Sequence, residues 1–345
     1  MKLGTYIVSG LIFLFAIAGV AYILVPTDYE LVVFDIPITL PVAVWVLIPA
    51  FLLFIVSILH IAFYGTKSFL KFRKFQKDSK ELKDAIYWSI LKEPKKHIYS
   101  TSEMKSFANI LDVSSINIKG TASILDDKLI KVTDMIKRVE NGEYVDLRES
   151  GIDGYLSKEN EILLLNNLNR LKAEPSFAKT ILQRRDAYNP KLIKEAIEVA
   201  IREWDFDELS KFASLIDKSG FYKILDLVDD NKKANFSLEN LRKFIDYKSF
   251  ECKDFMRVAK STVKRFSPDA NLALFKEMIK NSPKAQSAYL YILFEYEMRD
   301  SIKRFFEEHD ESDFRLFRAY EAIKASGQNI KIDEIINYQT ACNES

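Results

Sequence analysis

Two long apolar segments dominate the pattern of hydrophobic and polar positions near the start of the chain. Residues 6–25 contain no charged side chain. In residues 41–64 the only side chain that can carry a charge near neutral pH is His60. At a rise of about 1.5 Å per residue, each segment can cross a hydrocarbon core of about 30 Å. The pattern predicts a transmembrane hairpin over 1–66, with spans at 6–25 and 41–64 and a loop at 26–40.

A cleaved signal peptide is the alternative for the first span. Its apolar run exceeds the usual ~7–15 residues, and Val25-Pro26 follows instead of a small-residue cleavage site, so a retained anchor is favoured. In the loop, β-branched and apolar residues alternate around Pro37, which predicts a short extended or hairpin-like element at the outer membrane face.

Basic residues indicate the orientation of the hairpin. The loop holds three acidic residues and no Lys or Arg, whereas basic residues are dense after the second span. Because cytoplasmic flanks carry the excess of Lys and Arg, we expect a periplasmic loop, with the N-terminus and the C-terminal part in the cytoplasm.

Residues 67–101 are predicted to form a basic juxtamembrane helix and a linker. Phenylalanines in the membrane interface and basic side chains near anionic headgroups would hold this helix along the membrane surface. The alternative is that these basic residues only determine the orientation of the span and that the segment continues as an ordinary helix without lipid contact. The predicted membrane-surface residues are Lys67, Lys71, Arg73, Lys74, Lys77, Phe69 and Phe72.

Two residues of the second span are candidate functional positions. Pro49 removes a helical hydrogen bond and predicts a kink, which is either functional or merely structural. His60 is either a proton or metal ligand inside the membrane or an interfacial side chain.

The remaining chain has the periodicity of successive short helices. A small helical segment is predicted at 102–156, with a helix to about 111, a strand or loop at 113–121 and a helix at 122–139. A larger α-helical domain follows at 157–345, either an α-solenoid or a compact bundle. Its predicted helices are 157–172, 175–186, 190–203, 206–217, 219–229, 237–246, 250–265, 268–281, 283–297, 299–309, 313–326 and 332–339.

Composition and motifs exclude several classes of function. Lys and Arg total 50 against 49 for Asp and Glu, so no overall positive charge attracts nucleic acid. Cys252 and Cys342 are predicted to be free thiols in a reducing compartment, and no histidine has metal-ligand spacing to a cysteine. Phosphate-binding loops and a nucleophile elbow are absent from the sequence, which predicts a protein without catalytic activity, metal or cofactor.

Two resemblances extend this interpretation. The segment Glu30–Leu40, Pro41 and the charged run Lys67–Asp84 make the hairpin similar to the lipopolysaccharide assembly protein A domain family of bacterial inner membranes, although its second span lacks the glycines often found there. The small and aromatic residues of the helices after 268 resemble degenerate tetratricopeptide-type repeats, without the consensus glycine and tryptophan.

Together these features predict a mainly α, inner-membrane protein of the bacterial envelope. It would act as a protein-interaction scaffold or stabilising factor for an envelope complex, such as a flagellar motor or a lipopolysaccharide assembly machine. Its partners would be other inner-membrane or cytoplasmic proteins and anionic lipid headgroups. The alternatives are a lipid-handling or transport component that acts through the hairpin, and an unrecognised enzyme whose helical domain holds a deep polar pocket.

Overall fold

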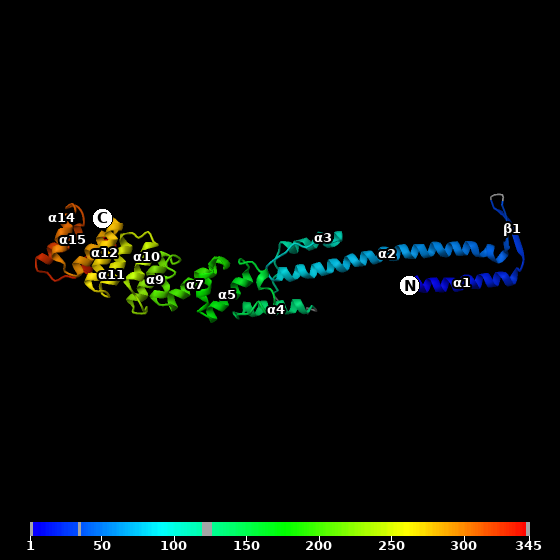
Figure 1. Ribbon diagram of the computed structural model, residues 1–345, viewed down its shortest axis with the longest axis horizontal. Coiled ribbons are helices and arrows are strands. Elements are labelled where there is room, and N and C mark those ends of the chain that lie inside the picture. The colour runs from blue at the N-terminus through cyan, green and yellow to red at the C-terminus, as the bar shows by residue number, and fades with distance from the viewer. Residues whose placement is uncertain (1–2, 34–35, 119–125, 343–345) are drawn as a thin grey trace. The chain divides into compact units, whose positions relative to one another are not determined.

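The computed structural model describes residues 3–33, 36–118 and 126–342 and contains two compact units, Met1–Ile136 and Lys137–Ser345. The chain is mainly α, with 68% helix and 3% strand, as the sequence predicts. Figure 1 labels most of the helices and strand β1.

The first unit begins with two helices joined by a β-hairpin (Figure 1). Its first four elements are α1 (Leu3–Leu24), β1 (Asp28–Val33), β2 (Ile36–Pro41) and α2 (Val42–Ile90). The two strands pair antiparallel, which confirms the predicted hairpin-like element. Helix α1 packs against the first half of α2, where the ring of Phe54 lies against Gly10.

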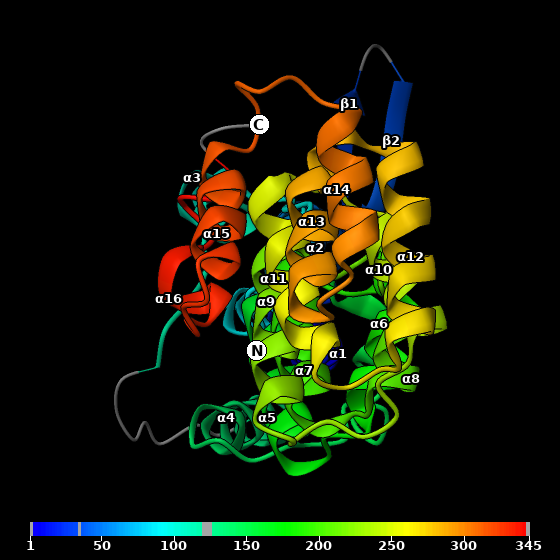
Figure 2. The same cartoon turned by 90° about the vertical axis from the view of Figure 1, so that its left-hand side faces the viewer.

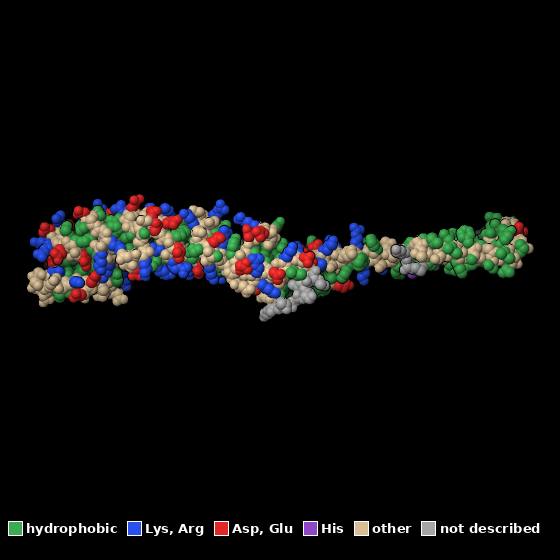
Figure 3. All heavy atoms as spheres, turned by 90° about the horizontal axis from the view of Figure 1, so that it is seen from below, with side chains coloured by type: hydrophobic (Ala, Val, Ile, Leu, Met, Phe, Trp, Pro, Cys, Tyr) green, Lys and Arg blue, Asp and Glu red, His purple; other side chains and the backbone are tan. Residues whose placement is uncertain are grey.

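Both helices are long and apolar enough to cross a bilayer. Most of their side chains face outward, and Leu14 is the only buried residue within α1. Apolar side chains cover this part of the molecule in Figure 3. A surface of this kind is stable in lipid and unfavourable in water, so these helices are candidate membrane spans.

Helix α2 is longer than its predicted span. It continues through Pro49 and through the whole basic segment to Ile90, so the predicted juxtamembrane helix is the second half of α2. Between residues 65 and 90 the sequence has Gly65 and no proline, so nothing there stops the helix.

The chain then returns along α2. Residues 91–101, here called the return segment, lead into α3 (Ser102–Ala108), η1 (Asn109–Asp112) and, later, α4 (Asp127–Glu140). The helix predicted to end near 111 is confirmed. Residues 113–118 are irregular, and the rest of the predicted strand or loop lies outside the described residues, as do the first residues of the helix predicted at 122–139.

The second unit contains one α-helix that overlaps each of the twelve predicted ranges. The bounds are α5 (Glu161–Ala173), α6 (Phe177–Gln183), α7 (Pro190–Glu203), α8 (Phe206–Ser210), α9 (Lys218–Asp229), α10 (Leu238–Asp246), α11 (Cys252–Val263), α12 (Pro268–Asn281), α13 (Gln286–Glu295), α14 (Arg299–Glu307), α15 (Arg315–Ala325) and α16 (Ile332–Ile335), with short 3-10 turns η2 (Asp153–Tyr155), η3 (Arg185–Ala187) and η4 (Pro283–Ala285).

Alternate helices of this unit contact one another. Helices α5, α7, α9, α11 and α13 form a row in which each contacts the next, and α8 contacts α10. Each helix of the row begins 28 to 34 residues after the previous one. Figure 2 shows α12, α13 and α14 side by side, and both α12 and α14 contact α13.

Polar links recur with the same spacing. Side chains bond to a group 29 to 37 residues away in many places, including Asn189 to Glu159, Asn235 to Asp205 and Lys284 to Glu251. These bonds tie the start of one helix to the equivalent position of the next helix pair. The regular spacing is that of stacked helical units, each of which buries its apolar face against its neighbour.

The core of this unit is one apolar cluster that extends from Leu171 to Ala341. A disulfide joins Cys252, the first residue of α11, to Cys342 after α16. The prediction of two free thiols is therefore wrong. The residues are 90 positions apart, and only the folding of the C-terminal segment onto α11 and α13 brings them together.

Candidate functional site

The two predicted positions within the second span lie at different depths of α2. Pro49 is an interior residue of the helix, about 1.4 turns from Phe54, which packs on α1. His60 is exposed, and its ring lies 4.6 Å from that of Tyr64. The structure brings Pro49 and His60 to no common site, and their functional roles stay predictions.

The predicted membrane-surface residues follow in the same helix. Phe69 and Phe72 are 62% and 58% exposed, so most of each side chain is left uncovered within the molecule. Counted along the helix from Tyr64, Lys67 lies about 5 Å and Lys71 about 10 Å further out, whereas Lys77 lies about 20 Å out. Because the headgroup layer is only about 5–8 Å thick on each side, a span perpendicular to the membrane would place Lys77 beyond it.

A shallow cavity of about 500 Å³ lies beside these residues. It is lined by four basic side chains, by the apolar Leu70, by Gln76 and by Ser100 of the return segment. Among the described residues, no carboxylate lies within 4 Å of the four cations. The basic residues are Arg73, Lys74, Lys77 and Lys80.

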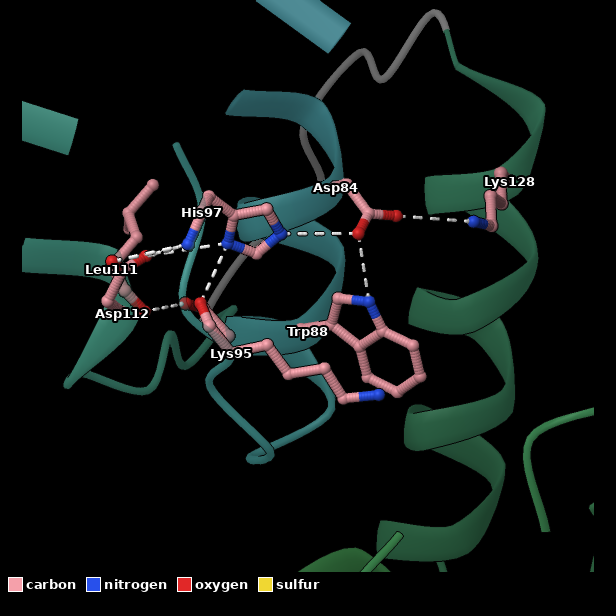
Figure 4. A network of polar contacts seen from close by, with 8 residues as sticks. Asp84, Trp88, Lys95, His97, Leu111, Asp112 and Lys128 are labelled. Carbon is pink, nitrogen blue, oxygen red and sulfur yellow. Dashed lines mark hydrogen bonds and ion pairs between the residues drawn. The ribbon is translucent and has the colours of Figure 1, made fainter. Parts of the chain in front are cut away.

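A cluster of three titratable side chains joins the end of α2 to the return segment and η1 (Figure 4). His97 is 6% exposed at its side chain, its Nε2 atom lies 3.2 Å from Asp84 of α2, and its Nδ1 atom lies 3.4 Å from Asp112 of η1. Nδ1 is also 2.7 Å from the carbonyl oxygen of Lys95. We call Asp84, His97 and Asp112 the His97 cluster.

Further contacts surround the His97 cluster. The indole of Trp88 donates to Asp84 at 3.0 Å, and the ammonium of Lys128, from α4, lies 3.7 Å from the same carboxylate. The ammonium of Lys95 lies over the Trp88 ring (Figure 4). Three segments of the chain therefore meet at one histidine.

The surroundings of His97 favour its charged form. Burial lowers the pKa of the imidazole, but hydrogen bonds to Asp84, Asp112 and the Lys95 carbonyl oppose this, and the net result is a raised pKa. Both carboxylates can accept from a doubly protonated ring, so the cation is the form that satisfies every partner.

Asp78 holds the other end of the return segment. Its fully buried carboxylate accepts from the backbone N–H groups of Ser100 and Thr101 at 2.7 and 2.8 Å and from the Thr101 hydroxyl at 2.6 Å. Burial alone would raise the pKa of this carboxyl, but these hydrogen bonds lower it. Asp78 and His97 thus attach the return segment to α2 at two points, and this attachment is structural.

The second unit contains a cavity of about 320 Å³ between α10, α11 and the end of α12. Lys248 lines it, donates to the carbonyl oxygen of Ala213 at 2.8 Å and, among the described residues, has no carboxylate within 4 Å. Burial lowers the pKa of this amine to about 8, and the negative charge of Asp217 opposes this only in part. A lysine of this kind is partly neutral near physiological pH.

Sequence reasoning missed both the His97 cluster and Lys248. The partners of His97 lie 13 and 15 residues away in irregular or helix-end positions, and no periodicity connects them. Within the described residues, no group of three or more His, Cys, Asp or Glu side chains has an arrangement suited to a metal ion.

Comparisons with known proteins found no match among protein-family models, curated proteins or solved structures. The two resemblances therefore depend on the sequence segments given above.

Proposed function

We propose that the chain is a non-catalytic scaffold of the bacterial inner membrane, in which α1 and α2 cross the bilayer and the second unit binds partner proteins. The row of stacked helices in the second unit carries this proposal. Such stacks present an extended surface, and they keep their core when surface residues change, which suits recognition of other proteins. Fixing this surface at a membrane raises its effective concentration near membrane-bound partners.

The cytoplasmic location of the second unit is part of the proposal. It is supported by the acidic loop, which lacks Lys and Arg, and by the basic residues from Lys67 onward. The disulfide between Cys252 and Cys342 favours the opposite side, because disulfides persist mainly in oxidising compartments. We favour the cytoplasmic side because basic residues close to a span determine its orientation directly.

The basic part of α2 divides between two kinds of partner in this proposal. Lys67 lies within the headgroup layer counted from Tyr64, and Lys71 lies just beyond it, from where its long side chain can reach back to a headgroup. Each contact with an anionic headgroup adds about 1 kcal/mol to membrane attachment. Lys77 and Lys80 line the basic cavity further out, where an acidic segment of a partner protein fits better than lipid.

Cross-linking in intact cells followed by affinity purification tests the scaffold function. The full-length chain and a variant lacking residues 1–64 are compared, and co-purifying proteins are identified by mass spectrometry. A stoichiometric set of envelope proteins held by both would support binding by the helical part. Capture of nothing by the shorter variant, or of lipid alone by the full-length chain, would refute it and leave the spans as the functional part.

A reporter fused after Ser345 tests the orientation. Fluorescence of a green fluorescent protein combined with inactivity of a periplasmic phosphatase supports the cytoplasmic side. The reverse pattern, with Cys252 and Cys342 resistant to thiol reagents in intact cells, would place the second unit outside.

A further inference from the structure

The β1–β2 hairpin has two chemically different faces. Its register pairs Tyr29 with Leu40 and Leu31 with Ile38, while Glu30 pairs with Thr39. Since successive side chains of a strand point to opposite faces, one face of the hairpin is entirely apolar among its described side chains. This apolar face consists of Tyr29, Leu31, Ile36, Ile38 and Leu40, and the opposite face consists of Asp28, Glu30, Val32, Pro37, Thr39 and Pro41.

The apolar face has little cover within the structure. Tyr29 and Ile36 are 55% and 62% exposed, and Leu31 and Ile38 are 38% and 37% exposed. Two strands alone are marginally stable in water and need an apolar surface on which to pack. The exposed face therefore requires an external partner.

The hairpin lies at the level of a membrane surface if the helices span the bilayer. Its strands run across the axes of α1 and α2 (Figure 1), and only residues 25–27 separate α1 from β1. The indole of Trp45, in the first turn of α2, donates to the Tyr29 carbonyl oxygen at 3.1 Å. Along the helix, Trp45 and Tyr64 are about 28 Å apart, close to the thickness of the hydrocarbon core, and such aromatic residues mark its two boundaries.

We propose that the hairpin lies flat on the periplasmic surface of the inner membrane. Its apolar face would lie in the lipid interface, and the opposite face, which carries Asp28 and Glu30, would face water. This inference rests on the proposed membrane insertion of α1 and α2. Lipid is the occupant because the apolar face continues directly from two outward-facing apolar helices. The acidic side chains, which anionic headgroups would repel, occupy the opposite face, and acidic atoms lie at the outermost edge of this end in Figure 3.

Spin labels on neighbouring residues of one strand test the proposal. Ile38→Cys and Thr39→Cys variants of the full-length chain, with the native disulfide kept oxidised, are labelled with a nitroxide in phosphatidylcholine–phosphatidylglycerol vesicles. Collision with oxygen reports lipid, and collision with a water-soluble nickel complex reports water. We expect a several-fold higher oxygen-to-nickel ratio at position 38 than at position 39. Leu31→Cys and Glu30→Cys repeat the comparison on the other strand.

A label at Leu53, which is 69% exposed on α2, separates failure of this inference from failure of the proposed function. If Leu53 is lipid-exposed but positions 38 and 39 are equally accessible to nickel, the hairpin inference is wrong, whereas the proposed membrane insertion of α1 and α2 is supported. If Leu53 is accessible to nickel as well, membrane insertion is wrong. Spin–spin broadening at position 38 that disappears on dilution with unlabelled protein would show that a second copy covers the face, which also overturns the inference.

Discussion

Individual side chains in this protein fix segments that have little secondary structure of their own. The return segment is held by Asp78 at one end and by His97 at the other, and folding lowers the pKa of Asp78 but raises that of His97. The raised pKa of His97 means that its stabilisation is complete below about pH 6.5 and is lost as the pH rises through the folded-state value. The lowered pKa of Asp78 gives stabilisation above about pH 4 that is lost as the pH falls.

A His97→Gln variant should remove the first of these pH dependences. Glutamine keeps hydrogen-bonding capacity but does not titrate, so the loss is expected to be on the order of 1–2 kcal/mol near pH 5.5 and smaller near pH 8.5. Thermal unfolding in detergent, followed by circular dichroism at both pH values, measures it. Equal destabilisation at the two pH values would show that His97 is not charged in the folded protein.

Lys248 should be unusually reactive. With its pKa lowered to about 8, its rate of acylation by a small anhydride should reach half its maximum near that pH, whereas an unperturbed lysine titrates near 10.4. Mass spectrometry of peptides after brief labelling across this pH range gives the profile, and Lys248→Arg identifies the peptide. A midpoint for Lys248 that coincides with the bulk of exposed lysines would contradict the assignment.

At the scale of elements, periodicity and start signals predict most of the helices. Pro190 and Pro268 each open a helix at the residue expected from sequence, because proline fits the first turn. Helix α2 continues past residue 64, the predicted end of the second span. A change from apolar to charged residues determines whether a helix favours lipid or water, but it does not interrupt the backbone hydrogen bonds of the helix. Pairing of Cys252 with Cys342 depends on the stacking of the helices, which no local pattern contains.

Removing the disulfide should destabilise the C-terminal elements. A bond that closes a separation of 90 residues restricts the unfolded chain by about 4.6 kcal/mol in the chain-entropy treatment. Urea unfolding of the wild-type chain with and without reductant should differ, and Cys342→Ser should behave like the reduced protein and be insensitive to reductant. An unchanged urea midpoint for Cys342→Ser would show that the bond contributes nothing to stability.

At the scale of the whole molecule, the chain divides into parts with separate sources of stability. The large apolar core lies entirely within the second unit, and its residues extend from Leu171 to Ala341. The first unit depends on α1–α2 packing and on the attachments made by Asp78 and His97. Sequence alone predicts an apolar hairpin followed by a helical domain, but it predicts neither the boundary after Ile136 nor the polar contacts that hold the return segment.

Residues 137–345 should therefore fold without the first unit. The fragment retains the core cluster, the row of helices and the disulfide, so we expect a soluble monomer with one cooperative unfolding transition. Size-exclusion chromatography and thermal circular dichroism test this expectation. Aggregation, or a gradual melt without a transition, would show that the second unit needs the preceding residues.

The unbroken length of α2 has a mechanical consequence. A helix of 49 residues is about 73 Å long, and about 39 Å of it lies beyond Tyr64. Spans tilt to match the thickness of the surrounding bilayer, so a tilt of about 10° would swing the far end of this lever sideways by roughly 7 Å. The residues around Ile90 would thereby move with the thickness of the membrane, without any change in the fold of the helix itself.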